Sequence, residues 1–263
     1  MGQALVPSLL KLSRAATSAL VFAMVFVPYY VRTWDLWSSI VLATPIFTIA
    51  MCIFILNDIN DVERDRINHP HRALPTGAIS VKTAGIVYLL LFGISLILVR
   101  ILIESGVHFV YLASFLLAIN YNTIVNNLPK LKNPYVAFTT TVPLFIVNSA
   151  LETATIPASV AIAMFLFVFG REMLMDVHDA PGDGETLAKW LTARRAAVIA
   201  FFLQAGAMVV LGLQLTSALR IISLSLILLL FAYILTRWTR PQARRSLIHL
   251  MKVQLVIALS FLL

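Results

Sequence analysis

The chain has 263 residues, of which 60% are hydrophobic and 12% are charged, with a formal net charge of +8. An ordinary soluble domain carries about 25% charged residues, so this chain cannot cover a water-facing surface, and the bilayer is its expected solvent. The single cysteine, Cys52, excludes a disulfide scaffold and a multi-thiolate zinc site, and the apolar composition excludes a disordered chain.

Nine apolar runs follow one another along the chain, and with their flanking residues each can cross a bilayer as a helix. Helices are expected because lipid offers no hydrogen-bond partner to backbone amides. The predicted spans are approximately Ala15–Val31, Leu36–Leu56, Ala84–Val99, Val107–Val125, Tyr135–Leu151, Ile156–Gly170, Ala196–Leu215, Ile221–Leu235 and Leu247–Leu263. We therefore predict an all-α integral membrane protein, a nine-transmembrane-helix bundle in a single domain over residues 1–263.

The basic residues predict an orientation for this bundle. All of them except Arg32, Arg100 and Arg220 fall at the N-terminus, in loops that follow the even-numbered spans or, for Lys252, near the start of the last span. Such a bias marks the cytoplasmic side of a multi-pass protein. Because the charges lie in short loops between apolar runs and form no basic face, we expect the lipid bilayer as a partner and no nucleic acid.

The acidic residues concentrate in two short segments, one after the second predicted span and one after the sixth. In the first segment Asn57, Asp61 and Asp65 are spaced i, i+4, i+8, so they would stack on one helical face with Asp58 beside them. Like charges at this spacing repel one another. A hard divalent cation would convert the repulsion into attraction, since Mg²⁺ binds carboxylate oxygens and often shares its ligands with phosphates.

The second segment repeats this character. Asp176 and Asp179 share a face at i+3, and Asp183 follows the helix break expected at Pro181 and Gly182. Two acidic segments on one side of an acid-poor membrane protein indicate more than one Mg²⁺ and a ligand with several negative oxygens, such as a diphosphate. The apolar interior suggests that the organic part of this ligand is a hydrocarbon, and an isoprenyl diphosphate meets both demands.

These residues resemble a known family. The run Asn57-Asp58-x-x-Asp61-x-x-x-Asp65, followed by Asn68-x-Pro70-x-Arg72-x-Leu74-Pro75-x-Gly77, resembles the first signature of the UbiA superfamily of intramembrane prenyltransferases. The run from Arg171 and Glu172 to Asp176, Asp179 and Asp183 resembles its second aspartate motif, and Tyr121, Pro129 and Asn133 resemble a third patch. The resemblance implies a nine-helix bundle whose central apolar cavity opens near the cytoplasmic face.

The resemblance also implies a reaction and a set of site residues. The enzyme would be a Mg²⁺-dependent prenyltransferase that moves an isoprenyl chain from a prenyl diphosphate, through an allylic carbocation, to a small acceptor that is aromatic or lipid-like. The implied metal ligands are Asn57, Asp58, Asp61, Asp65, Asp176, Asp179 and Asp183, of which Asp61, Asp65, Asp179 and Asp183 are the catalytic candidates. The implied diphosphate-binding residues are Asn57, Arg72, Arg64, Arg171, Lys130, Tyr121 and Arg14.

The sequence departs from the family pattern where Asn126 and Asn127 stand in place of a basic residue. Lys130 or Lys132 is a candidate substitute, and the amides would also suit the guidance of a carbocation. A second hypothesis is therefore a terpene cyclase of the same superfamily, which ionises and cyclises a prenyl diphosphate without an acceptor. A third, a transporter or cation channel, requires acidic residues near mid-bilayer, and the predicted spans contain almost none.

Overall fold

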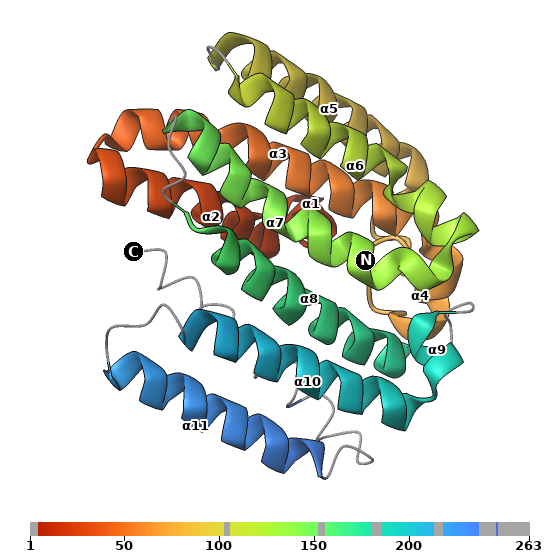
Figure 1. The fold of residues 1–263 in the computed structure, drawn as a ribbon. Helices are drawn as coiled ribbons and strands as arrows, with labels where there is room; N and C mark the ends of the chain where they lie inside the picture. Colours follow the sequence, from red (N-terminus) through yellow and green to blue (C-terminus); the bar gives the residue numbers. More distant parts are fainter. Residues whose placement is uncertain are drawn as a thin grey trace. The chain divides into compact units, whose positions relative to one another are not determined.

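Every element in the described part of the chain is a helix in the computed structural model (Figure 1). The structure describes residues 5–102, 106–151, 156–179, 186–212, 218–236 and 246. The helices are α1 (Leu5–Leu12), α2 (Ala15–Thr33), α3 (Leu36–Asn60), α4 (Val62–Asn68), α5 (Val81–Leu102), α6 (Val107–Asn127), the short 3₁₀ helix η1 (Pro129–Leu131), α7 (Lys132–Ala150), α8 (Ala158–Asp179), α9 (Leu187–Leu191), α10 (Ala193–Gly212) and α11 (Ala218–Leu235). The predicted all-α class is confirmed for this part of the chain.

The chain divides into two compact units, where the sequence indicated no boundary. Unit 1 contains residues 1–123 with 142–154, and unit 2 contains residues 124–141 with 155–263. The single-domain organisation therefore stays a prediction.

Five of the described helices are long and apolar enough to cross a membrane. They cover Ala15–Thr33, Leu36–Asn60, Val81–Arg100, Ala158–Val177 and Ala193–Leu211, and Val107–Tyr121 is a shorter apolar helix. The predicted spans Tyr135–Leu151 and Ile221–Leu235 coincide with α7 and α11 to within a few residues. The predicted span Leu247–Leu263 lies outside the described residues, so the count of nine stays a prediction.

Two helices extend further than their predicted spans. Hydropathy ended the second span at Leu56 and the sixth at Gly170, whereas α3 runs to Asn60 and α8 to Asp179. The reason is that hydropathy records where the apolar surface stops, while helical hydrogen bonding stops only where the backbone is interrupted. The acidic residues Asp58 and Asp176 therefore lie in the last turns of these helices and not in the loops after them.

In unit 1, α3 packs against α2 on one side and α5 on the other (Figure 1). At one end of α3 a buried cluster of Leu12, Ile55, Leu74, Ile79 and Ala84 draws the loop after α4 back onto the helices. Gly77 turns this loop with a φ of +72°, a conformation that glycine adopts without strain. The folded-back loop carries Arg72, which is thereby held next to the end of α3.

The turn between α2 and α3 has the composition of a membrane–water interface. The Asp35 carboxylate caps α3, accepting hydrogen bonds from Ser38 Oγ at 2.6 Å and from Ser38 N at 3.0 Å. These hydrogen bonds favour the charged form and lower the pKa of Asp35. Trp34 and Trp37 are exposed on either side of this cap, as is typical of aromatic residues at the level of lipid headgroups.

In unit 2, α8 and α10 pack closely through small residues. Ala196, Ala197, Ala200 and Ala207 of α10 are buried against α8. A Cβ atom placed on Gly170 of α8 would lie 2.9 Å from the backbone oxygen of Ala200, so no larger residue fits there without a shift of the backbone. Small residues allow this approach of two helices in a membrane, where no hydrophobic force drives them together.

We expect Gly170→Val to lower the stability of the protein by about 1–3 kcal/mol, because overpacking forces the two helices apart. The measurement is the thermal unfolding midpoint in detergent. Gly93→Val in α5 is the matched control, since a Cβ atom at Gly93 would meet nothing within 4 Å. An equal midpoint for the two variants would contradict the close packing of α8 and α10.

Candidate active site

The first acidic cluster lies where α3 ends and α4 begins. The backbone remains helical across the junction, because Asp61 N donates to Asn57 O at 2.9 Å and Asp65 N donates to Asp61 O at 2.8 Å. Asn57, Asp61 and Asp65 are therefore joined by successive helical hydrogen bonds, as their spacing predicts. Asp58 and Asp65 are both buried, with 5% and 4% of their surface exposed. Buried carboxylates require a compensating cation or hydrogen bonds.

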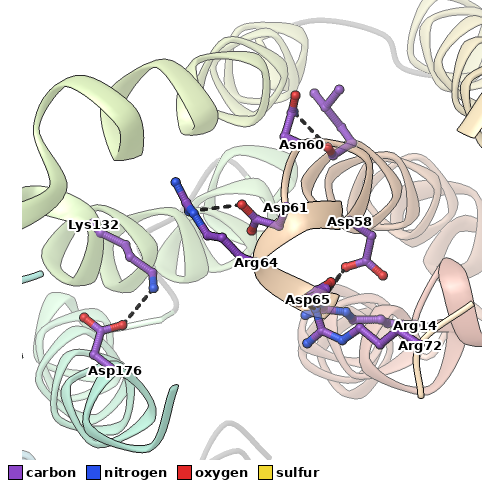
Figure 2. A network of polar contacts seen from close by, with 10 residues as sticks. Arg14, Asp58, Asn60, Asp61, Arg64, Asp65, Arg72, Lys132 and Asp176 are labelled. Carbon is purple, nitrogen blue, oxygen red and sulfur yellow. Dashed lines mark hydrogen bonds and ion pairs between the residues drawn. The ribbon is translucent and has the colours of Figure 1, made fainter. Parts of the chain in front are cut away.

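Two arginines from distant parts of unit 1 supply this charge (Figure 2). Arg14 Nη2 lies 2.7 Å from Asp58 Oδ1. Arg72 Nη1 lies 2.7 Å from Asp65 Oδ1 and 2.6 Å from Asp65 Oδ2, and 3.6 Å from Asp58 Oδ1. The structure thus brings together four predicted site residues in one network of alternating charge. A third basic residue, Arg64, contacts Asp61 Oδ1 at 3.0 Å.

Arg14 reaches Asp58 from a strained backbone. It is the N-cap of α2 with φ 45° and ψ 48°, the left-handed region that non-glycine residues rarely adopt. Its guanidinium also lies over the ring of Phe54, 5.0 Å from the centroid. Strain of this kind costs of order 1–3 kcal/mol, and it persists where the surrounding contacts hold it in place. The ion pair with Asp58 is one such contact.

The second acidic cluster lies in unit 2, at the end of α8. Asp176 has 1% of its side chain exposed, and Lys132 Nζ lies 2.7 Å from its Oδ1 atom. Arg171 contacts the neighbouring Glu172. Asp179 is the last residue of α8, but its side chain is outside the described set, and Asp183 lies outside the described residues.

The other predicted site residues lie as follows. Lys130, in η1, is exposed and stacks over the Trp190 ring, with Nζ 4.9 Å from the centroid. Tyr121 is half-buried near the end of α6. Asn133, in the third patch, is fully buried at the start of α7. The roles of these residues in binding stay predictions.

Comparison with known proteins decides the family. Residues 16–256 of the chain match the UbiA prenyltransferase family. The chain belongs to this family. Its expected membership is therefore confirmed, and so is the expected class of enzyme, a prenyltransferase, at the level of the family.

Curated relatives of this UbiA-family chain include archaeal enzymes. The chain is 28% identical over 202 residues to the digeranylgeranylglyceryl phosphate synthase of Methanothrix thermoacetophila, which covers 71% of this chain and 75% of the relative. It is 34% identical over 148 residues to the protein of that name from Pyrococcus abyssi, which covers 55% of this chain and 53% of the relative. The chain thus aligns with about half the length of the second relative.

Solved structures share the fold. A structure of digeranylgeranylglyceryl phosphate synthase in membranes has a TM-score of 0.70 at 20% identity, covering 98% of this chain and 97% of the other. A UbiA homologue from Archaeoglobus fulgidus bound to GPP and Mg²⁺ has a TM-score of 0.64 at 15% identity, covering 96% and 98%. The UbiA fold therefore extends over nearly the whole chain.

The donor set of the first cluster fits a hard cation such as Mg²⁺. The Oδ1 atom of Asn57 is buried and has no hydrogen-bond partner among the described residues, and the nearby acids offer further oxygens. No three His, Cys, Asp or Glu side chains within the described ranges gather closely enough to hold a metal ion by themselves. Amide oxygens and ligand phosphates would have to complete the coordination, as is usual for Mg²⁺.

The sequence indicates Lys130 as a diphosphate-binding candidate with Lys132 as the alternative, and the structure pairs Lys132 with the acidic cluster. A usable signal was present in the sequence. Lys132 precedes Asp176 by 44 residues, the same separation at which Arg14 precedes Asp58. Both acidic clusters also share the pattern Asp-x-x-Asp-x-x-x-Asp. Given the pair Arg14–Asp58, the residue 44 positions before Asp176 is Lys132.

We expect Arg14→Met to destabilise the protein by about 1–3 kcal/mol, because it leaves the buried Asp58 carboxylate with a weaker partner. The value is below that of a fully buried pair, since 30% of the Arg14 side chain is exposed and Arg72 lies nearby. The thermal unfolding midpoint in detergent measures the change.

Arg66→Met is the matched control, because Arg66 and Glu63 form an ion pair that is 61% and 79% exposed. Exposed pairs contribute about 0–1 kcal/mol, so its midpoint should hardly move. The double variant Arg14→Met/Asp58→Asn should recover part of the loss. Equal midpoints for the Arg14 and Arg66 variants would show that the Arg14–Asp58 pair is not a structural contact.

Proposed function

We propose that this chain is a Mg²⁺-dependent membrane prenyltransferase that moves an isoprenyl chain from a prenyl diphosphate to a lipid acceptor. The observation that carries the proposal is the network in which Arg14 and Arg72 contact the buried carboxylates of Asp58 and Asp65. Carboxylate oxygens suit a divalent cation, and guanidinium groups suit phosphate oxygens. A ligand that carries both, a metal diphosphate, is complementary to this end of α3 and α4.

The donor is proposed from a relative. The Archaeoglobus fulgidus homologue binds GPP and Mg²⁺, which supports a prenyl diphosphate and Mg²⁺ for this chain. One Mg²⁺ would be held in the first cluster by Asn57, Asp58, Asp61 and Asp65, and another in the second by Asp176, Asp179 and Asp183, on the cytoplasmic side. These ions would supply positive charge that stabilises the departing diphosphate.

The acceptor is proposed from the curated relatives. Their name describes a product in which two geranylgeranyl chains are attached to glyceryl phosphate. We assign geranylgeranyl diphosphate as the donor and a geranylgeranylglyceryl phosphate as the acceptor. These relatives support a lipid-like acceptor and give no support to an aromatic one.

The proposed step exchanges one carbon–oxygen bond for another. The bond between the allylic carbon and the diphosphate breaks, and the diphosphate leaves with the electron pair. The acceptor hydroxyl oxygen then bonds to the allylic carbon, and its proton passes to the departed diphosphate. Arg72, held at the cluster by the folded-back loop, would bind the phosphate oxygens as charge builds on them, which is where electrostatic stabilisation lowers a barrier.

Product analysis tests this proposal. Purified protein with Mg²⁺ and geranylgeranyl diphosphate should form prenylated lipid only when geranylgeranylglyceryl phosphate is added, as detected by mass spectrometry. A cyclic hydrocarbon or alcohol formed without acceptor would instead establish the terpene cyclase. If no diphosphate were released either with or without the acceptor, both the prenyltransferase and the terpene cyclase would be refuted.

We expect Asp61→Ala to lower turnover by about 100-fold or more, because loss of even an indirect metal partner costs 10–100-fold in affinity or activity. The protein should stay folded, since Asp61 is only partly buried and its removal leaves the apolar core intact. Turnover and the unfolding midpoint are measured on the same preparation.

Glu63→Ala is the matched control within the same segment. The Glu63 side chain is 79% exposed and pairs with Arg66, away from the buried carboxylates. Its turnover should equal that of the native protein. If Asp61→Ala and Glu63→Ala were equally active, Asp61 would not belong to the site.

A further inference from the structure

The two ion pairs at the acidic clusters occupy equivalent positions in their units. Arg14 is the N-cap of α2 and contacts Asp58 in the last turn of α3. Lys132 is the first residue of α7 and contacts Asp176 in the last turn of α8. Each cation precedes its acid by 44 residues. The arrangement is therefore repeated and is not an isolated contact.

Lys132 and Asp176 both lie at the helix end that disfavours their charge. A helix N-terminus carries partial positive charge and a C-terminus partial negative charge, so a misplaced unit charge costs about 0.3–1 kcal/mol. Lys132 is at an N-terminus and Asp176 at a C-terminus, and Asp176 is buried as well. The helices themselves therefore give no reason for these residues, and a role toward a ligand would give one.

The carboxylate of Asp176 is only half used by Lys132. Its Oδ1 atom receives the ammonium group, and the side-chain amide of Asn133, the next residue after Lys132, is a second hydrogen-bonding neighbour of the same carboxylate. The amide oxygen of Asn133 is buried and has no hydrogen-bond partner in the part of the chain that the structure describes. Buried polar atoms of this kind normally find a partner, and a bound ligand would supply one.

Lys132 is also built to move. Its side chain is 19% exposed, so the ammonium group lies between the buried carboxylate and the surface. A lysine has a flexible four-carbon stem and a point charge that any phosphate oxygen accepts. The pair thus joins a buried carboxylate to the partly exposed end of a long side chain.

We propose that Lys132 is a phosphate-binding residue that pairs with Asp176 only until substrate arrives. This exchange rests on the proposed function and has two parts. Asp176 passes from Lys132 to the divalent cation, and Lys132 donates to a phosphate oxygen of the incoming diphosphate. Charge is balanced in both states, since one carboxylate and one ammonium group keep partners of opposite sign throughout.

This exchange predicts opposite effects of one substitution on two ligands. We expect Lys132→Met to bind Mg²⁺ alone about threefold tighter or more, because the internal cation no longer competes for Asp176. The same variant should bind inorganic pyrophosphate with Mg²⁺ about tenfold more weakly, the loss expected for one charged hydrogen bond. Isothermal titration of the detergent-solubilised full chain measures both affinities without turnover.

Three variants complete the test. Lys132→Arg should restore pyrophosphate binding, and Lys82→Met, which removes an exposed lysine from the first turn of α5, should leave both affinities unchanged. Lys132→Met/Asp176→Asn removes both charges, so it leaves no unpaired buried carboxylate and should fold even if Lys132→Met does not. Because it also lacks the ammonium group, it should bind pyrophosphate as weakly as Lys132→Met.

Opposite shifts for Mg²⁺ and pyrophosphate would support the exchange. Parallel losses of both would show that Lys132 only holds the end of α8, and unchanged affinities would show that it does not meet the ligand; either result overturns the inference and leaves the proposed function standing. A native protein that binds no Mg²⁺-pyrophosphate would refute the proposed function itself, and the exchange with it.

Discussion

A carboxylate buried in the last turn of a helix needs a cation, and this need organises the polar end of each unit. Burial opposes a negative charge at both Asp58 and Asp176, and at Asp176 the C-terminal end of α8 opposes it as well. Arg14 and Lys132 meet them from the start of the preceding helix. Each ion pair therefore connects the beginning of one helix to the end of the next. The first aspartate of each acidic motif is held in place by this contact.

Much of the first cluster could be predicted from the sequence because its information is local. The spacing of Asn57, Asp61 and Asp65 has meaning only on a helix, and the helix continues through them. Arg72 lies within the same segment, and the buried Leu74 and Ile79 fold its loop back toward α3. The apolar spans were predictable for the same reason, since hydropathy is a property of each run alone.

Features that depend on a distant partner could not be predicted in this way. Lys130 and Lys132 are separated by one residue, yet Lys130 stacks on Trp190 and Lys132 reaches Asp176. Lys130 belongs to η1 and Lys132 begins α7, so the two lysines lie in helices of different type. The local pattern does not record that change of helix type, although the equal spacing of the two cation–acid pairs along the chain points to Lys132. Hydropathy marked only the apolar parts of α3 and α8, and the helical spacing of the acidic residues indicated that both helices continue.

The two clusters differ in the cations that meet them, and this difference bears on how each responds to a ligand. In unit 1 the planar guanidinium of Arg72 contacts both oxygens of Asp65, and Arg14 is fixed over Phe54. In unit 2 a single flexible lysine contacts one oxygen of Asp176, and Arg171 is engaged by Glu172. One guanidinium nitrogen of Arg72 is held by Asp65 and lies near Asp58 as well, whereas an ammonium group on a flexible four-carbon stem exchanges its single partner more readily. The first cluster is therefore suited to presenting a preformed surface, and the second to rearranging when charge arrives.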